Sequence, residues 1–196
     1  HPKYVDSINT KTLKSSEDSV ESMLTLANNF TATTDVDQGL EFSDILFVLV
    51  ATPSLDNGKY DHSQIDRLAN QLIKQGRQET TKELIIGCTT MPGYCDDLQA
   101  RLERYNYNVS YNPEFIAQGT VIRDQLYPDI VLIGSRNEES ANKIKGVYER
   151  LVENTPVYSI MSPISAEICK IALNCFITTK IAFTNMVGDL ATKVGG

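Results

Sequence analysis

Short apolar runs alternate with amphipathic helical patterns along most of this chain, and this alternation constrains the fold more than any other feature. Strands separated by helix-length segments pair in parallel, because each return to the same end of a sheet needs a long crossover. The run Ile-Leu-Phe-Val-Leu-Val at 45–50 is continuously apolar, as a strand covered by helices on both faces should be. The sequence therefore predicts an α/β fold with a doubly wound, mostly parallel sheet. The expected strands are Phe30–Thr33, Ile45–Val50, Leu84–Cys88, Val109–Tyr111, Ile130–Ile133 and Val157–Ile160, and the expected helices are Asp18–Asn28, Ser63–Gln75, Gly93–Arg104 and Glu138–Val152.

The last segment differs from the rest, because neither proline nor glycine interrupts it between Pro163 and Gly188. Ser162 supplies an N-cap and Pro163 a first-turn proline, so one helix is expected to begin there and to run to about Lys193. It would be roughly 45 Å long at about 1.5 Å per residue. The segment is too apolar for a helix that faces water on most of its circumference. We expect a buried backbone helix and a homodimer contact through residues 163–193.

The chain is expected to divide into an incomplete Rossmann-like NAD-binding domain at 1–161 and the long helix at 162–196, which would lead into an absent second domain. No G-x-G-x-x-G occurs, although a phosphate-binding strand, turn and helix normally open a doubly wound nucleotide-binding half. The opening His-Pro-Lys-Tyr has the pattern of a turn and helix that follow a strand. The sequence is therefore expected to be a fragment whose sheet lacks its first and central strand.

The composition is that of an ordinary soluble globular protein, with 41% hydrophobic and 22% charged residues among 196. A net charge of −7 with scattered Lys and Arg residues argues against binding to nucleic acid or to an anionic membrane. No continuous apolar run approaches the roughly 20 residues of a membrane span, and no signal-peptide pattern opens the chain, so a cytoplasmic location is expected. Four cysteines without a Cys-x-x-Cys pair, and only two histidines, predict neither disulfides nor a metal site.

Val50, Ala51, Thr52 and Pro53 directly follow the most hydrophobic expected strand. They therefore lie at a carboxyl end, where open α/β sheets bind ligands. A proline after a strand is also common as a simple strand stop, so position alone leaves both interpretations open.

The stretch Cys88-Thr-Thr-Met-Pro-Gly93 ends a strand and opens a helix. Its hydroxyls and the free N–H groups of the helix terminus could hold a phosphate or an oxyanion. The alternative is plain N-capping of the helix by threonine. Cys88 is not expected to be a nucleophile, because no histidine lies near it in sequence and nothing visible lowers its pKa.

The stretch Tyr111-Asn-Pro-Glu-Phe-Ile-Ala-Gln-Gly119 places Glu114 between a proline and apolar residues just past a strand. A carboxyl group in such surroundings loses hydration, which raises its pKa and makes it usable as an acid or base near neutral pH. From the pattern alone, a solvated loop glutamate is the more common outcome.

Lys170 and Asn174 lie four residues apart in the long helix, so they share a face and point toward the same object. A lysine in so apolar a stretch is costly without an anionic partner. That partner would be a substrate oxygen, a carboxylate or, in the simplest interpretation, Glu167 three residues earlier.

Together these stretches resemble the UDP-glucose/GDP-mannose dehydrogenase family over nearly the whole length and in the right order. The Asn-Pro-Glu-Phe block at 112–115 is the strongest element. Val-Ala-Thr-Pro at 50–53 resembles the V-x-T-P cofactor turn of the family, and Thr-Thr-Met-Pro at 89–92 resembles its S-T-V-P turn. Residues 165–181 resemble its S-A-E-L-x-K-x-x-x-N-x-F…K-I signature.

The resemblance implies NAD-dependent, four-electron oxidation of the C6 alcohol of a nucleotide sugar to a carboxylate through a covalent thioester, with UDP-glucose as the expected substrate. It implies that Glu114 is the acid/base in thioester hydrolysis, that Lys170 and Asn174 stabilise oxyanions at C6, and that Thr90 holds the water or the reacting oxygen. It also implies that the long helix joins two Rossmann-like domains and forms a dimer interface. The implied substrate-binding residues are Glu114, Phe115, Ile116, Ala117, Gln118, Lys170 and Asn174, and the implied NAD-binding residues are Val50, Ala51, Thr52, Pro53, Ser54, Thr89, Thr90, Met91 and Gln118.

The sequence also departs from the family pattern. The glycine loop, the ribose-binding acidic residue and the nucleophilic cysteine belong to regions that this chain does not contain, so this polypeptide alone is not expected to turn over substrate. Gln118 stands where many members have Glu, and Gly93-Tyr94 replaces the usual V-G, which puts the cofactor contacts at both places in doubt.

Three alternatives remain open at this stage. A dehydrogenase for UDP-N-acetylated hexosamines or GDP-mannose would keep all the motifs and change only the sugar and base contacts. A non-catalytic dimerisation or nucleotide-sugar-binding module would explain the long apolar helix and the missing nucleophile. A two-electron β-hydroxyacid dehydrogenase also carries a helical Lys and Asn four apart, but it would not account for Asn-Pro-Glu-Phe.

Overall fold

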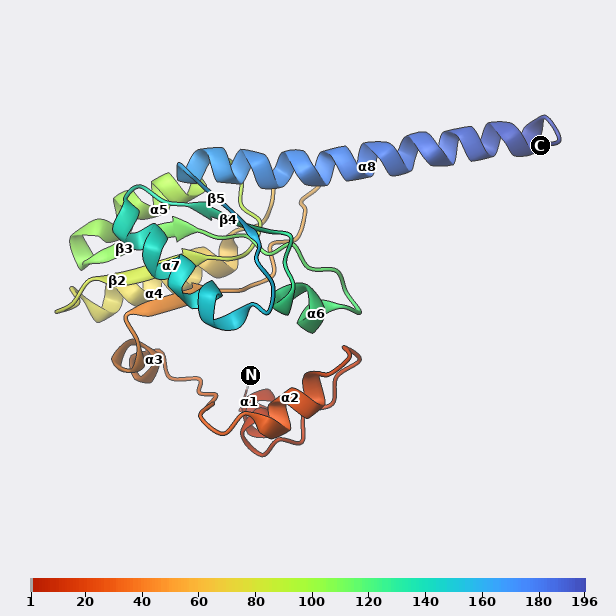
Figure 1. The fold of residues 1–196 in the computed structure, drawn as a ribbon. Coiled ribbons are helices and arrows are strands. Elements are labelled where there is room, and N and C mark those ends of the chain that lie inside the picture. The colour runs from red at the N-terminus through yellow and green to blue at the C-terminus, as the bar shows by residue number, and fades with distance from the viewer. Residues whose placement is uncertain (1) are drawn as a thin grey trace.

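The computed structural model describes residues 2–196, and its centre is a five-stranded sheet in which the strands follow one another in chain order (Figure 1). The strands are β1 (Ile45–Val48), β2 (Lys82–Ile86), β3 (Tyr107–Tyr111), β4 (Ile130–Gly134) and β5 (Val157–Met161). β1, β2 and β3 pair in parallel, as do β4 and β5, whereas β3 meets β4 in antiparallel at Tyr111 and Gly134. The mostly parallel α/β sheet predicted from the sequence is therefore confirmed.

Helices cover both faces of the sheet. On one face α4, α5 and the start of α8 pack over Val48, Leu84, Ile86 and Leu132, and on the other face α7 packs over Ile85 and neighbouring apolar residues. The helices are α1 (Pro2–Asn9), α2 (Val20–Leu26), α3 (Val36–Phe42), α4 (Ser63–Gln75), α5 (Tyr94–Leu102), a 3-10 turn η1 (Glu103–Tyr105), α6 (Val121–Leu126), α7 (Glu138–Leu151) and α8 (Pro163–Lys193).

The strand predicted at Phe30–Thr33 is wrong. This segment is irregular and lies with α1 and α2, away from the sheet in Figure 1. The side-chain amide of Asn9 bonds to both main-chain groups of Ala32, donating to its carbonyl (2.8 Å) and accepting from its N–H (2.7 Å). The side chain of Asn9 thus supplies the hydrogen bonds that a neighbouring strand would make. The prediction failed because β-propensity describes how well a residue fits a sheet and is not an intrinsic preference of the backbone.

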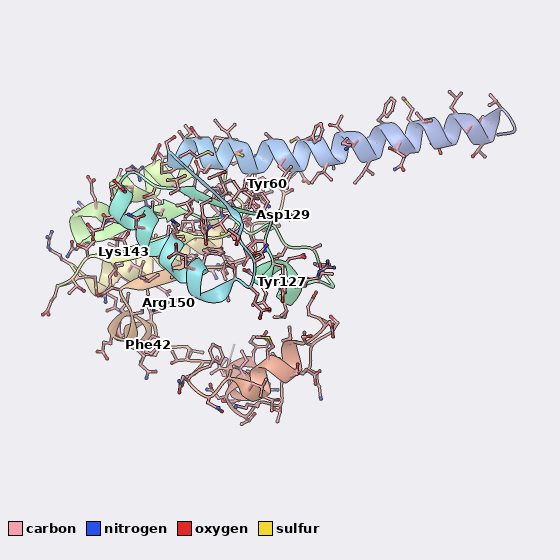
Figure 2. All side chains as sticks on the ribbon, viewed as in Figure 1. Phe42, Tyr60, Tyr127, Asp129, Lys143 and Arg150 are labelled. Carbon is pink, nitrogen blue, oxygen red and sulfur yellow. The ribbon has the colours of Figure 1, made fainter. Side chains whose placement is uncertain are left out.

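The long helix begins and ends where the sequence predicts, but only its first turn is buried. The Ser162 hydroxyl accepts from the N–H of Ser165 (3.4 Å), and the buried residues are Pro163, Ala166 and Glu167. Figures 1 and 2 show the distal half of α8 extending beyond the sheet, with side chains around its circumference and no other element beside it. Within this chain, the prediction of a buried helix is therefore wrong beyond the first turn.

The mean hydropathy of α8 gives a different result from the length of its uninterrupted apolar runs, which were too short for a membrane span. Averaged over an 18-residue window, its mean hydropathy is 1.2 and none of that window is buried, so by length and composition it could cross a membrane. The polar residues that interrupt the apolar runs are spread thinly enough for the average to remain high. The expectation of no membrane contact stays a prediction.

Gly134, the last residue of β4, sets how closely α8 approaches the sheet. A Cβ at this position would lie 2.8 Å from the Cβ of Ala166 and 2.9 Å from the Cα of Pro163. Since real Cβ contacts are wider than this, any side chain at 134 would push the start of α8 away. The glycine therefore places the first turn of α8 directly on β4.

Candidate functional site

The two predicted cofactor turns lie side by side at one edge of the sheet. Val50–Ser54 follows β1 and Thr89–Met91 follows β2, and the parallel pairing of Val48 with Ile86 brings both turns to the carboxyl ends of neighbouring strands. That edge is where open α/β sheets bind ligands. The hydroxyl and peptide groups of the turns suit a dinucleotide, because most of their residues are partly or fully open to solvent, namely Val50, Ala51, Thr52, Pro53, Ser54, Thr89 and Met91.

A short hairpin that begins at Pro53 connects these turns. The N–H of Asp61 donates to the carbonyl of Pro53 (2.8 Å), and the chain then reaches His62, whose Nε2 accepts from the main-chain N–H of Met91 (3.3 Å). Burial lowers the pKa of His62, which favours the neutral ring that can accept this bond. Pro53 therefore opens a hairpin and does more than end a strand. No sequence motif indicated this hydrogen bond between His62 and Met91.

The turn after β2 is held by a buried carboxylate from α8. Glu167 is fully buried, and its Oε1 accepts hydrogen bonds from the Thr90 hydroxyl and the Cys95 N–H, both at 2.9 Å. Its Oε2 accepts from the N–H of Gly93 at 2.6 Å. These contacts join residues 72 to 77 positions apart in the chain. Sequence spacing could not reveal such partners, so the role of Glu167 was missed.

Both interpretations of residues 88–93 need correction. The N-cap residue of α5 is Gly93, at φ 91°, which has no side chain to cap with, so threonine does not cap this helix. The N–H groups of Gly93 and Cys95 are not open to a phosphate, because they donate to Glu167. A carboxylate from a distant helix thus supplies the anion that a helix N-terminus favours. Thr90 is itself fully buried, with its hydroxyl directed to Glu167.

Asn112, the first residue of the Asn-Pro-Glu-Phe block, anchors the turn that leaves β3. Its N–H donates to the carbonyl of Ile86 and its side-chain amide to the carbonyl of Leu132, each at 2.9 Å. Its Oδ1 accepts from the hydroxyl of Tyr148 on α7 (2.8 Å). The buried asparagine therefore joins β2, β4 and α7, and it fixes the position of the glutamate two residues later.

Glu114 is half-buried at the start of this turn. Loss of hydration raises the pKa of its carboxyl group, an effect that the charge of Lys170 opposes. Its Oε1 accepts from the side-chain amide of Gln125 (3.3 Å). The desolvation expected from the sequence is confirmed, and the alternative of a fully solvated loop glutamate is wrong.

Lys170 extends from α8 to the same turn. Its Nζ donates to the main-chain carbonyl of Glu114 (2.6 Å) and lies 4.4 Å from the ring centroid of Phe115. Burial lowers the pKa of Lys170, and the carboxylate of Glu114 opposes that shift. The pairing of Lys170 with Glu167 considered from the sequence is therefore wrong, since Glu167 binds the turn after β2. Asn174 lies one helical turn further on and is half-buried.

The remaining predicted substrate residues, 116–118, lie on an exposed loop. The N–H of Ala117 donates to the carboxylate of Asp124 (2.9 Å), and the N–H of Gly119 donates to both carboxylate oxygens of Glu17 (2.8 and 3.0 Å). Ile116, Ala117 and Gln118 are thus not brought against Lys170, in contrast to Phe115.

Glu114 lines two adjoining cavities. One of about 440 Å³ is mostly apolar and extends from Glu114 toward Phe47 and Leu49 on the β1 side. The other, of about 190 Å³, extends from Glu114 toward Leu173 on α8 and Asp129. Glu114, whose carboxyl pKa is raised, therefore lines partly open cavities on two sides, at the edge of the sheet that carries both cofactor turns.

Known proteins resemble this chain in sequence and in fold. Residues 1–152 match the NAD binding domain of the UDP-glucose/GDP-mannose dehydrogenase family. The UDP-glucose 6-dehydrogenase of Rickettsia felis is 32% identical over 176 residues, which cover 87% of this chain and 38% of that protein. The chain thus spans well under half of that relative.

Solved structures agree. The GDP-mannose dehydrogenase of Pseudomonas aeruginosa superposes with a TM-score of 0.89 at 23% identity, covering 100% of this chain and 47% of that one, a likeness of fold. The UDP-glucose dehydrogenase of Pyrobaculum islandicum superposes with a TM-score of 0.85 at 25% identity, covering 97% of this chain and 46% of that one. This chain belongs to the UDP-glucose/GDP-mannose dehydrogenase family and carries its NAD-binding domain.

Proposed function

We propose that this chain is the NAD-binding part of a nucleotide-sugar 6-dehydrogenase that oxidises the C6 alcohol of UDP-glucose to the carboxylate of UDP-glucuronate. The observation that carries the proposal is the convergence of Glu114 and Lys170, a desolvated carboxyl group and a desolvated ammonium group, beside the two cofactor turns. The matching family domain and the similarity to the Rickettsia felis UDP-glucose 6-dehydrogenase support the substrate class.

In this proposal Val50–Ser54 and Thr89–Met91 would hold the cofactor, together with Gln118. NAD, when bound, supplies the hydride acceptor for each of the two oxidations. The protein residues position the sugar, exclude water from the first oxidation and move protons in the second.

Lys170 would donate a hydrogen bond to the developing oxyanion at C6, because its ammonium group already lies at the Glu114 turn in desolvated surroundings. Asn174 would add a second donor from the next turn of the same helical face. Fixed donors in a dry site stabilise developing charge more than water does, since they need no reorganisation.

Glu114 would act as general base for the water that cleaves the thioester of C6, taking one proton from that water while the C–S bond breaks and the thiolate leaves. A raised pKa suits proton transfer near neutral pH. Thr90 would orient this chemistry only indirectly, since its hydroxyl is buried against Glu167. Burial raises the pKa of Cys88 and of Cys95, which makes both poor nucleophiles.

We further propose that α8 forms a homodimer contact and that the protein works in the cytoplasm. Its binding partner there would be the nucleotide-sugar substrate, and not a membrane or a nucleic acid. The large apolar side chains of its distal part are exposed in the single chain, at positions Phe176, Ile177, Ile181, Phe183, Met186, Val187 and Leu190. Exposed apolar area of this kind is normally covered by a partner.

The test is the number of NADH molecules formed per sugar by the full-length protein. UDP-glucose, UDP-N-acetylglucosamine, UDP-N-acetylmannosamine and GDP-mannose would be offered separately. Two NADH per UDP-glucose is the expected result. Two NADH from another sugar would keep the mechanism and change the substrate, and none from any sugar would favour a non-catalytic binding or dimerisation module.

A further inference from the structure

We propose that Glu167 is a positioning residue for this site, which holds the cofactor turn after β2 at a set distance from Lys170 and Glu114. This inference rests on the proposed function. It starts from Glu167, Thr90, Gly93 and Cys95, which together form what is here called the Glu167 network.

The chemistry of this network requires a carboxylate. All three partners of Glu167 donate a hydrogen, and two of them are main-chain N–H groups that cannot accept one. A carboxylate offers only acceptors, whereas a glutamine of the same size would turn an NH₂ group toward Gly93 or toward Cys95 and Thr90. Hydrogen bonds to a charged acceptor are about twice as strong as neutral ones.

The burial of the network adds to its effect. Glu167, Thr90 and Cys95 are all fully buried, so water cannot replace a lost bond. Burial raises the pKa of Cys95, and the negative charge of Glu167 adds to that shift. The network is therefore a desolvated, charged contact between α8 and the start of α5.

The position of Glu167 on α8 links this contact to the Glu114 turn. Lys170 follows Glu167 by three residues, and its Nζ bonds to the carbonyl of Glu114. One rigid helical turn therefore carries two contacts, one to the turn after β2 and one to the turn after β3. Because both residues lie on this one turn, which Gly134 lets pack directly on β4, a movement of the turn would displace both contacts together.

The consequence is geometric. Thr89–Met91 is proposed to hold the cofactor. Lys170 is proposed to bind the oxygen on C6, the carbon that gives up the hydride. Hydride transfer needs these two sites at a fixed separation, and a misplacement of about 1 Å can cost about 100-fold in rate. Glu167 is fully buried and its carboxylate is occupied by Thr90, Gly93 and Cys95, so it would act through the turn that it holds.

The experiment compares Glu167→Gln with Glu83→Gln in the full-length protein. Glu83 is also a buried carboxylate, on β2 at the opposite end of the strand, where it accepts from Lys143 (labelled in Figure 2) at 2.8 Å. The two substitutions make the same chemical change in two buried sites. Both are expected to lower the thermal midpoint, but only Glu167→Gln is expected to lower kcat, by about 100-fold, and to weaken NAD binding.

A double-mutant cycle with Thr90→Val identifies the route of the effect. If Glu167 acts through the turn at Thr90, the loss of kcat from Glu167→Gln will be several-fold smaller in the Thr90→Val background than in the wild type. Glu167→Asp, which keeps the carboxylate, is expected to recover part of kcat and serves as the second variant should Glu167→Gln fail to fold.

Three results would overturn the positioning role: kcat and NAD affinity of Glu167→Gln equal to the wild type, equal losses in Glu83→Gln, or full additivity with Thr90→Val. A wild-type protein that oxidises no nucleotide sugar would overturn the proposed function instead. In that case NAD affinity, measured by calorimetry, still decides the inference: it is weakened by Glu167→Gln and not by Glu83→Gln if the turn is positioned as proposed.

Discussion

The two ends of α8 have similar amino-acid character and very different surroundings. At the start, Pro163, Ala166 and Glu167 are buried against β4 and α5, and Lys170 reaches the Glu114 turn. In the distal half, large apolar residues such as Phe183 and Leu190 are exposed by about 60%. The comparison teaches that the apolar pattern of a helix shows how much surface needs covering, whereas the small residue Gly134 decides where covering occurs within the chain.

The largest effect is expected from Lys170→Ala at the near end. Removing the ammonium group should cost about 3 kcal/mol or more of transition-state stabilisation, as the loss of an oxyanion donor does, with NAD binding largely intact. Steady-state kinetics and NAD titration of the full-length protein measure both. Lys193→Ala, at the exposed far end of the same helix, is the matched control and should leave kcat unchanged. Unchanged turnover in Lys170→Ala would remove it from the mechanism.

Gly134→Ala should disturb the docking of the near end. The added methyl group would meet Ala166 and Pro163 at under 3 Å, which is expected to lower the free energy of unfolding by about 1–3 kcal/mol. Urea unfolding checks this value. Gly146→Ala on α7, where a Cβ meets nothing within 4 Å, should be neutral or slightly stabilising. Equal stability of the two variants would contradict the close approach of α8.

Phe183→Glu tests the distal end. A charge at this exposed position should leave the stability of the subunit within about 0.5 kcal/mol, since the side chain contacts little in the single chain. It should raise the dimer dissociation constant by about tenfold or more, because a charge would be buried in the apolar contact. Sedimentation measures this constant. A protein that stays monomeric without the substitution, or that floats with liposomes, would contradict the dimer proposal.

The smallest expected effect concerns the pH dependence of Glu114. Its pKa is raised in the folded protein, so ionisation costs folding free energy as pH rises past the unfolded value of about 4.3, and the full cost is present above the folded pKa. Glu114→Gln should therefore gain relative stability between acid and neutral pH. It should also accumulate the thioester, which mass spectrometry detects. A wild-type rate of acid release would exclude the general-base role.

Local sequence patterns predicted the elements of this fold well where the cause was local. Ser162 and Pro163 marked the start of α8, and the apolar period marked α4 with the bounds that the structure has. The strand predicted at Phe30–Thr33 is wrong because a strand needs a neighbouring strand, whereas the main chain of Ala32 bonds to the side chain of Asn9. The helices α3 and α6 were missed, since they are short and have few buried residues.

The candidate site divides in the same way. The flanking proline and apolar residues raised desolvation of Glu114 as one interpretation, although the pattern alone favoured a solvated loop, and the apolar stretch around Lys170 indicated a desolvated lysine. The partners of these groups did not follow. Spacing offered Glu167 as one possible partner of Lys170, whereas Glu167 binds Thr90 and the start of α5.

The sequence by itself determined the alternation of strands and helices, the length of α8 and the residue types at the carboxyl edge of the sheet, because periodicity, caps and desolvation by neighbours act over a few residues. Only the tertiary structure decided which groups meet across that edge. Glu167 reaches Thr90, 77 positions earlier, because Gly134 admits the first turn of α8 to β4. A hydrogen bond depends on positions within a few tenths of an ångström, and residue spacing along the chain does not contain that information.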